Sequence, residues 1–191
     1  MRYLIKIFLF VSVFMLSFKA DNRTVNFPKS VEKIKNAPNK NKVWVFLMAG
    51  QSNMAGRGFV EPCDTVPHKR ILSVNREGEL ILAKEPLHFY EPSNTGLDCG
   101  LSFGKTLLKG IPKNISVLII PTAIGGSSIQ QWIGDSLFRE VKLLSNFREK
   151  AAWGAKYGQI KGILWHQGES DAKESNIPVH EEKLAVLFSV F

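Results

Sequence analysis

Three apolar runs divide the chain, and each is followed by a polar cluster that contains glycine or serine. The runs are VWVFLM at residues 43–48, ISVLIIP at 115–121 and QIKGILW at 159–165. Short continuous runs of this kind favour β-strands, and the first two are apolar enough to be buried on both faces of a sheet. The clusters GQSNM, GGSS and HQGES follow the three predicted strands in turn.

Helical patterns separate these runs. Residues 101–108 (LSFGKTLL) predict a helix that a nearby glycine and proline close. In residues 136–157 apolar side chains recur every three or four positions, which predicts a longer helix. Residues 179–190 predict an amphipathic helix, whereas residues 56–99 are rich in glycine, proline and polar residues and predict long loops with short strands.

Strands that alternate with helices favour an α/β sandwich with a parallel sheet, here a single domain over residues 43–191. Ligands of such sheets bind outside the carboxyl ends of the strands. All three polar clusters would lie at that edge. Any one of them could be ordinary turn chemistry, but the three together predict a functional site.

The N-terminal segment predicts export. Residues 1–20 combine basic residues with an apolar run, which is typical of a secretory signal peptide, with Ala20 a possible last residue before cleavage. A membrane anchor is the alternative, although the run is short for a span. Residues 21–42 are polar with two prolines and are interpreted as a leader or linker.

Net charge and cysteine content bear on three questions: binding to nucleic acid or membrane, disulfide formation and zinc binding. Removal of Arg2, Lys6 and Lys19 with the signal peptide lowers the net charge from +8 to +5. The remaining lysines are scattered without interleaved aromatic residues, so no nucleic-acid partner is expected, and no stable membrane partner either. Cys63 and Cys99 could form a disulfide, but the sequence does not show whether they lie close enough. No cluster of cysteine and histidine has the spacing of a zinc site.

Ser52 is the candidate nucleophile. It follows a predicted strand, where a turn into a helix would expose its hydroxyl and aim backbone N–H groups at the same point. Small neighbours such as Gly50 and Gly56 would let a substrate carbonyl approach the backbone. The alternative is that Ser52 only caps a helix.

The other two clusters offer complementary groups. Gly126 could present a free backbone N–H, or its loop could be a simple tight turn. Gln167 could donate a side-chain N–H to an oxyanion. Glu169 could orient a histidine, or it could be a charge at a helix N-terminus.

The motifs GQSNMAGRG, PTAIGGSSIQQW and ILWHQGESDA together resemble the sialate O-acetylesterase and carbohydrate esterase family six group of the SGNH-hydrolase superfamily. The resemblance extends over about residues 42–187. It implies a flavodoxin-like three-layer α/β/α sandwich and removal of acetyl groups from sugars, such as acetylated xylan or O-acetylated sialic acid. It implies no metal or organic cofactor.

The resemblance also implies roles for the candidate residues. Ser52 would be the nucleophile, and the backbone N–H of Ser52, Gly126 and Gln167 would form the oxyanion hole. Glu169 matches a glutamate that resembles the acid of a catalytic triad. In other descriptions of this family the acid comes from a later Asp-x-x-His motif, which also supplies the histidine.

The chain departs from the family after HQGE. Among the residues after Glu169, Asp171 is the only aspartate and His180 the only histidine, and they do not form an Asp-x-x-His motif. His180 is interpreted as a residue of a surface helix. In the family His166 would be structural. His68 and His88 lie in predicted loops with no acid partner in view. We therefore expect the last strand, the last helix and the catalytic base to be missing, and the chain as given to be inactive or impaired.

A non-catalytic carbohydrate-binding protein is the main alternative. Trp132 and Trp165 lie near predicted strand ends and could stack on a sugar ring. Packing in the core is the other interpretation of both side chains, and the one that we favour. In either case the expected partner is an acetylated carbohydrate.

Overall fold

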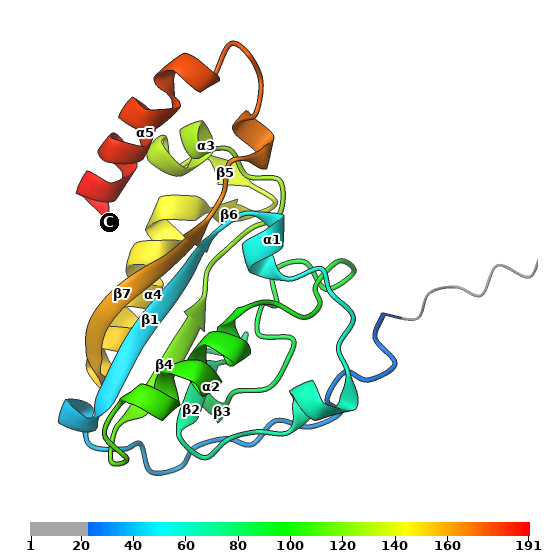
Figure 1. Cartoon of the computed structure of the whole chain (residues 1–191), viewed down its shortest axis with the longest axis vertical. Helices are drawn as coiled ribbons and strands as arrows, with labels where there is room; N and C mark the ends of the chain where they lie inside the picture. The colour runs from blue at the N-terminus through cyan, green and yellow to red at the C-terminus, as the bar shows by residue number, and fades with distance from the viewer. Residues whose placement is uncertain (1–22) are drawn as a thin grey trace, which may run out of the picture.

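A five-stranded sheet in the order β3-β2-β4-β1-β7 forms the centre of the structure (Figure 1). The computed structural model describes residues 23–191, so the signal peptide expected at residues 1–20 lies outside the described residues. Four strands run parallel, and β3 pairs with β2 in the antiparallel sense. The strands comprise Val43–Gly50 (β1), Ile71–Val74 (β2), Leu80–Leu82 (β3), Ser116–Pro121 (β4) and Gln159–His166 (β7).

The three predicted strands are confirmed as β1, β4 and β7. β1 lies between the other two, with Val45 opposite Leu118 and Leu47 opposite Ile163. Every residue of β4 is buried, as its continuous apolar run predicts. β7 is an edge strand of the described sheet, and Ile163 on it is 36% exposed.

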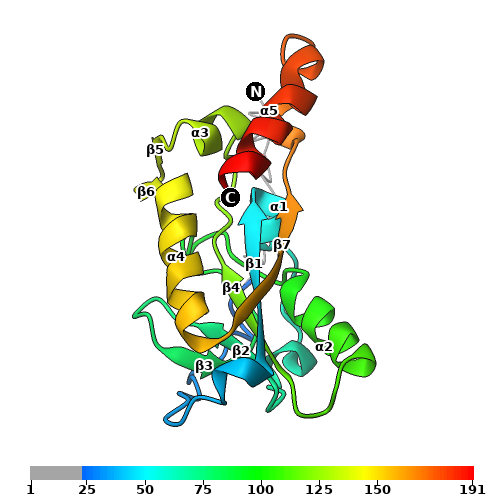
Figure 2. The ribbon, with the colours of Figure 1, turned by 90° about the vertical axis from the view of Figure 1, so that its left-hand side faces the viewer.

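Helices cover both faces of the sheet (Figure 2). α2 (Gly100–Gly110) precedes β4 and packs on one face, whereas α4 (Leu143–Tyr157) follows β4 and packs on the other. Each face has its own apolar core, with Phe147 in the core under α4 and Leu101 in the core under α2. The three-layer α/β/α class is therefore confirmed. Its strand order differs from that of flavodoxin-like sheets, in which the first two strands of the chain are neighbours.

The helix expected over residues 136–157 begins later than predicted, at Leu143. The preceding segment is a small hairpin, β5 (Leu137–Phe138) and β6 (Val141–Lys142). Leu137, the first apolar residue of the spacing that predicted the helix, lies on this hairpin and is 70% exposed. The prediction failed here because the spacing continues across a turn, and spacing alone does not register the change in backbone conformation.

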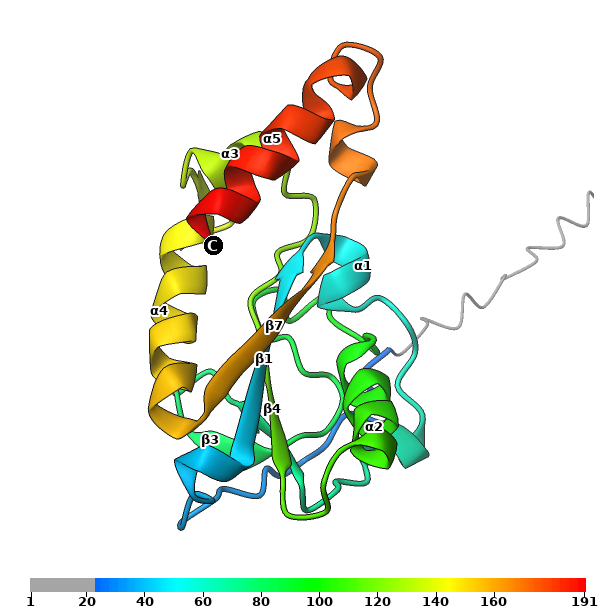
Figure 3. The ribbon, with the colours of Figure 1, turned by 60° about the vertical axis from the view of Figure 1, so that its left-hand side comes forward.

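The C-terminal helix α5 (Ile177–Val190) lies beside α3 (Ile129–Ile133), beyond the carboxyl end of the sheet (Figure 3). Leu187 is its buried residue, and the ring of Phe191 stacks on Phe147 with centroids 4.3 Å apart. None of the helices among residues 23–191 combines the length and the apolar character needed to cross a membrane.

The segment interpreted as a leader follows the edge of the sheet. Ile34 N–H donates to Leu80 O at 2.8 Å and Leu82 N–H donates to Glu32 O at 2.9 Å, so this segment lines β3. It ends in a short 3-10 helix, Lys40–Lys42. The loops between β1 and α2 contain a second such helix, Pro62–Thr65. The disulfide left open above is not formed, because Cys63 and Cys99 are both free.

Candidate active site

Ser52 is the first residue of the short helix α1 (Ser52–Ala55), directly beyond the end of β1. Gln51 rather than Ser52 occupies the N-cap position. The sharp turn depends on Gly50, whose φ of +132° is outside the range that side-chain-bearing residues favour. A Cβ on Gly50 would lie 2.1 Å from the backbone oxygen of His166, so only glycine fits between β1 and β7.

Two backbone N–H groups beside this turn are free. Among the hydrogen bonds of residues 23–191, none has the N–H of Ser52 or of Gly126 as donor. The loop that carries Gly126 is fixed to β1, because Ile124 N–H and the Ser127 hydroxyl both donate to Gly50 O at 3.1 Å. The predicted convergence of the first two polar clusters is therefore present in the structure.

Gln167 joins all three clusters. Its Nε2 donates to Ser127 O at 3.3 Å, to Gln51 Oε1 at 3.2 Å and to Asp171 Oδ2. Its Oε1 is buried without a partner among the described residues. The amide lies where the sequence predicts it, but its N–H groups point at protein acceptors, so its role as an oxyanion donor stays a prediction.

Glu169 lies beside α1. Its Oε1 accepts a hydrogen bond from Asn53 Nδ2 and is 3.8 Å from His166 Nε2. The carboxylate is thus next to a histidine, as its expected role requires, although the histidine is the one that the resemblance treats as structural. His180 lies on α5 and lines a cavity with Gly168 and Asp171. None of the four histidines of the chain hydrogen-bonds to Ser52 in the described structure.

Sequence reasoning missed two residues that hold the HQGES loop in place. Gln51 is 3% exposed, and its Oε1 accepts from Ser170 N–H at 3.1 Å and from Gly168 N–H at 3.5 Å. Asp171 is buried and accepts from Ile129 N–H at 2.8 Å, at the start of α3. Both were visible as polar residues within the quoted motifs, but nothing in the sequence indicated that they would be buried.

A second omission is Glu91, which supports the glycine loop. Its buried carboxylate accepts from Gly125 N–H at 2.5 Å and pairs with Arg57 at 2.9 Å and with Arg139. No spacing pattern links these residues, since Glu91 is 34 residues from Arg57 in sequence and 48 from Arg139.

The two candidate sugar-stacking tryptophans pack in the core. Trp132 is fully buried, and its Nε1 donates to Ser127 Oγ at 2.9 Å. Trp165 packs edge-on against it with centroids 5.5 Å apart, and Phe188 and Phe191 pack against Trp165. The favoured interpretation of both side chains as packing residues agrees with these contacts, and the carbohydrate-binding alternative loses its main support.

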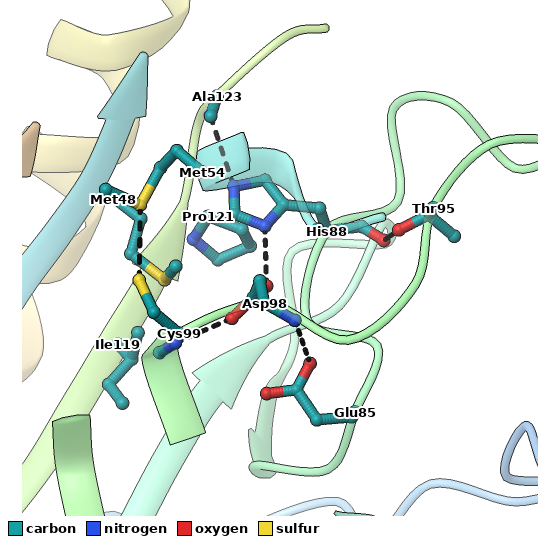
Figure 4. Close-up of polar contacts among 12 residues, drawn as sticks. Met48, Met54, Glu85, His88, Thr95, Asp98, Cys99, Ile119, Pro121 and Ala123 are labelled. Atoms are coloured by element: carbon teal, nitrogen blue, oxygen red, sulfur yellow. Dashed lines mark hydrogen bonds and ion pairs between the residues drawn. The ribbon is translucent and has the colours of Figure 1, made fainter. Parts of the chain in front are cut away.

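A buried polar cluster lies in the loops behind the site (Figure 4). His88 Nδ1 is 2.9 Å from Asp98 Oδ2, and Ala123 N–H donates to His88 Nε2 at 3.3 Å. The expectation that His88 lacks an acid partner is therefore wrong. Both ring nitrogens are occupied, so His88 braces the loop after β4 and is not free to act on Ser52.

Glu85 in this cluster gives a prediction on stability. Burial, followed by the negative charge of Asp98, holds the pKa of Glu85 well above its ordinary value. The folded protein therefore binds this proton more tightly than the unfolded chain. The protonated Glu85 carboxyl therefore contributes its full share of stability below its ordinary, unfolded-state pKa. This contribution is lost as the pH rises through the raised pKa of the folded state.

We expect Glu85→Gln, which keeps a neutral side chain of the same shape, to be about 1–3 kcal/mol more stable than the parent at pH 8, since the parent must there bury a charge or hold its proton. The two proteins should be nearly equal at pH 4. Urea unfolding across this range measures the difference. Parallel pH profiles of the two proteins would contradict the assignment.

Comparisons with known proteins agree with this geometry. The model of the family described as "Carbohydrate esterase, sialic acid-specific acetylesterase" matches residues 42–191. The Arabidopsis thaliana protein named "Probable carbohydrate esterase At4g34215" is 31% identical over 146 residues, which are 66% of this chain. The chain spans about half of that relative, 54% of its length.

Solved structures show the same fold. The crystal structure of the Arabidopsis protein superposes with a TM-score of 0.67 at 25% identity, over 76% of this chain and 66% of that one. The crystal structure of NanS gives 0.62 at 21% identity, over 81% and 62%. A carbohydrate acetylesterase from Xanthomonas citri gives 0.50 at 16% identity, over 75% and 37%. With the family match over residues 42–191, these findings show that the chain belongs to the sialic acid-specific acetylesterase family of carbohydrate esterases.

Proposed function

We propose that this domain hydrolyses acetyl esters of carbohydrates through Ser52. The observation that carries the proposal is the pair of unpartnered N–H groups of Ser52 and Gly126, in two segments that hydrogen bonds to Gly50 O hold together. Such donors are aimed where the negative charge of a tetrahedral intermediate develops. Membership in a carbohydrate esterase family supports the same chemistry.

In the proposed reaction, Ser52 Oγ attacks the acetyl carbonyl while a base takes the hydroxyl proton. The N–H groups of Ser52 and Gly126 hold the oxyanion, with Gln167 as a further donor if its amide turns from Asp171. The base then protonates the departing sugar oxygen, and water hydrolyses the acetyl-enzyme. Glu169 orients the imidazole that serves as base; the 3.8 Å separation between its Oε1 and His166 Nε2 supports a role beside a histidine.

The N-terminal segment leads us to propose that the protein acts outside the cytoplasm. The support is the basic and apolar pattern of residues 1–20 in the sequence.

The Ser52 hydroxyl has no histidine partner in the described structure, and this allows the proposed function to be tested on the 191-residue chain. Because no histidine hydrogen-bonds to its hydroxyl, we expect slow hydrolysis of 4-nitrophenyl acetate by this chain alone. Imidazole added to the buffer can act as a diffusing base, so the rate should rise with its concentration. The release of 4-nitrophenolate measures both rates.

Imidazole also cleaves this ester without the protein, so the Ser52→Ala variant under identical conditions is the control. The difference between the two proteins is the expected signal. If the chain is fast without imidazole and His166→Ala stops it, His166 is the base and the chain needs no other. If no rate depends on Ser52 under any condition, the proposed function is wrong.

A further inference from the structure

The loop of residues 123–127, which we call the glycine loop, presents one free N–H group. Its other four N–H groups all donate to protein acceptors: Ala123 to His88 Nε2, Ile124 to Gly50 O, Gly125 to Glu91 Oε2 and Ser127 to Ile124 O. Within residues 23–191 no acceptor meets the N–H of Gly126, the proposed oxyanion donor. The orientation of that donor is therefore set by the groups that bind its neighbours along the chain.

The contact of Gly125, next to Gly126, is made to a buried carboxylate. Gly125 N–H donates to Glu91 Oε2 at 2.5 Å, and the Glu91 side chain is only 5% exposed. A hydrogen bond to an ionised group is about twice as strong as one between neutral groups. A Cβ on Gly125 would lie 2.6 Å from Glu91 Oε2 and 2.8 Å from Oε1, so the carboxylate lies directly against the backbone of the glycine loop.

The same carboxylate oxygen binds the segment that follows Ser52. Arg57 Nη2 donates to Glu91 Oε2 at 2.9 Å, and Arg57 Nη1 donates to Gly56 O at 2.8 Å. Gly56 directly follows α1, the four-residue helix that begins at Ser52. Glu91 thus joins the two segments that carry the free N–H groups, at a point other than the hydrogen bonds to Gly50 O.

The charges around Glu91 suit a site where negative charge develops. A lone carboxylate beside an oxyanion would oppose it. Glu91 pairs with two guanidinium groups, that of Arg57 at 2.9 Å and that of Arg139, so the three side chains together carry one excess positive charge. The carboxylate can therefore hold the glycine loop without weakening an oxyanion there.

We propose that Glu91 is a positioning residue for the reaction at Ser52. By binding Gly125 and Arg57 with one carboxylate oxygen, it fixes the spacing between the N–H groups of Ser52 and Gly126. The proposal rests on the proposed function. Preorganised donors stabilise a transition state because they need not reorient as charge develops, and a misplacement of about 1 Å costs about 10²-fold in rate. The reach of the Glu91 side chain, more than its charge, is the property that matters.

Two substitutions separate reach from charge. Glu91→Gln keeps the length, and its amide oxygen can replace Oε2 as the acceptor for Gly125 and Arg57. Its NH2 group then faces Arg139, whose side chain is 47% exposed and can turn to water. Glu91→Asp keeps the charge but is one methylene shorter, so its carboxylate cannot stay against both partners.

The kinetic test is the Ser52-dependent hydrolysis of 4-nitrophenyl acetate in imidazole buffer, with the rate of Ser52→Ala subtracted. Glu91→Asp should lower kcat about 10–100-fold, and Glu91→Gln should lower it less than about tenfold. KM should change little in both variants, because oxyanion donors act on the transition state more than on the bound ester.

Asp64→Ala is the control for a merely structural role. It removes a carboxylate that also accepts a backbone N–H, that of Glu61 at 3.0 Å, in the 3-10 helix of residues 62–65. It should lower the melting temperature slightly and leave kcat unchanged. A Glu91→Asp variant with a lower melting temperature but an unchanged kcat would overturn the proposal. So would a larger loss of kcat in Glu91→Gln than in Glu91→Asp, since charge and not reach would then matter.

If Glu91→Asp does not fold, Arg57→Ala gives the second test. It breaks the link on the Ser52 side and leaves Glu91 bound to Gly125. It should lower kcat about 10–100-fold, and an unchanged kcat would overturn the proposal.

Amide NMR of the 191-residue chain with isotope-labelled glycine supplies a readout that needs no catalysis. In Glu91→Asp the Gly125 proton should move upfield and exchange faster with solvent, because its hydrogen bond weakens, and the Gly126 resonance should move with it. Glu91→Gln should cause smaller changes. A Gly126 resonance unaffected by Glu91→Asp would overturn the proposal. If the resonances move but no rate depends on Ser52 under any condition, the proposed function is wrong and Glu91 still fixes the glycine loop.

Discussion

Replacing Ser52 with alanine should lower kcat for acetyl esters by about 10⁴–10⁶-fold in any form of the protein that hydrolyses them, because the nucleophile is lost while the oxyanion donors remain. The hydroxyl makes no hydrogen bond in the described structure, so the melting temperature should change little. Steady-state kinetics and thermal unfolding of the same preparation measure both effects.

Ser170→Ala is the matched control. Ser170 is another serine of the three clusters, but its hydroxyl donates to Gly126 O at 3.1 Å instead of standing free. We expect an effect of less than about tenfold, as for one neutral hydrogen bond. A Ser52→Ala variant that kept more than a few per cent of the activity would remove Ser52 from the mechanism.

Gly50→Ala should unfold the domain or destabilise it by more than about 4 kcal/mol, a loss confined to a few mechanisms such as backbone clashes and strain. The new Cβ would lie 2.1 Å from His166 O and 2.7 Å from His166 C, and neither backbone atom can move without breaking the pairing of β1 with β7. The positive φ at Gly50 adds strain to this clash. Urea unfolding, or the soluble yield if no folded protein is obtained, gives the result.

Alanine variants of two other glycines serve as controls that separate the steric clash at Gly50 from the cost of its positive φ. Gly78 has a φ of +78° with nothing within 4 Å of a Cβ, so Gly78→Ala should cost only about 1–2 kcal/mol. Gly110, at the end of α2, has open space and no positive φ, and Gly110→Ala should be neutral or stabilise by up to about 1 kcal/mol. A Gly50→Ala variant no worse than Gly78→Ala would show that β7 yields to the added methyl group.

The main layers of the fold could be predicted because local patterns specify them. Continuous apolar runs mark β1 and β4, and the three-to-four spacing marks α2 and most of α4. The β5–β6 hairpin could not be predicted in this way. Its turn residues, Arg139 and Glu140, are not the asparagine and glycine that announce such a turn, so the apolar spacing of the helix ran through it.

The candidate site likewise has a part that the sequence predicts and a part that it does not. Ser52, Gly126, Gln167 and Glu169 each follow a strand, and parallel strands bring their carboxyl ends to one edge, so their convergence follows from topology. The contacts that support these residues do not follow from the topology. Glu91 reaches Arg139 across 48 residues, and His88 meets Asp98 inside a folded loop; no repeat or motif encodes either pair.

The exposed edge of β7 bears on how the protein behaves in concentrated solution. An edge strand presents unpaired backbone donors and acceptors, which can template a strand from another molecule. Ile160 and Ile163 add apolar surface there, being 45% and 36% exposed. Between them, Lys161 holds its ammonium 5.5 Å from the centroid of the Trp44 ring. A charge on an edge strand opposes pairing with another chain, so we expect modification that neutralises the Lys161 amine to favour aggregation.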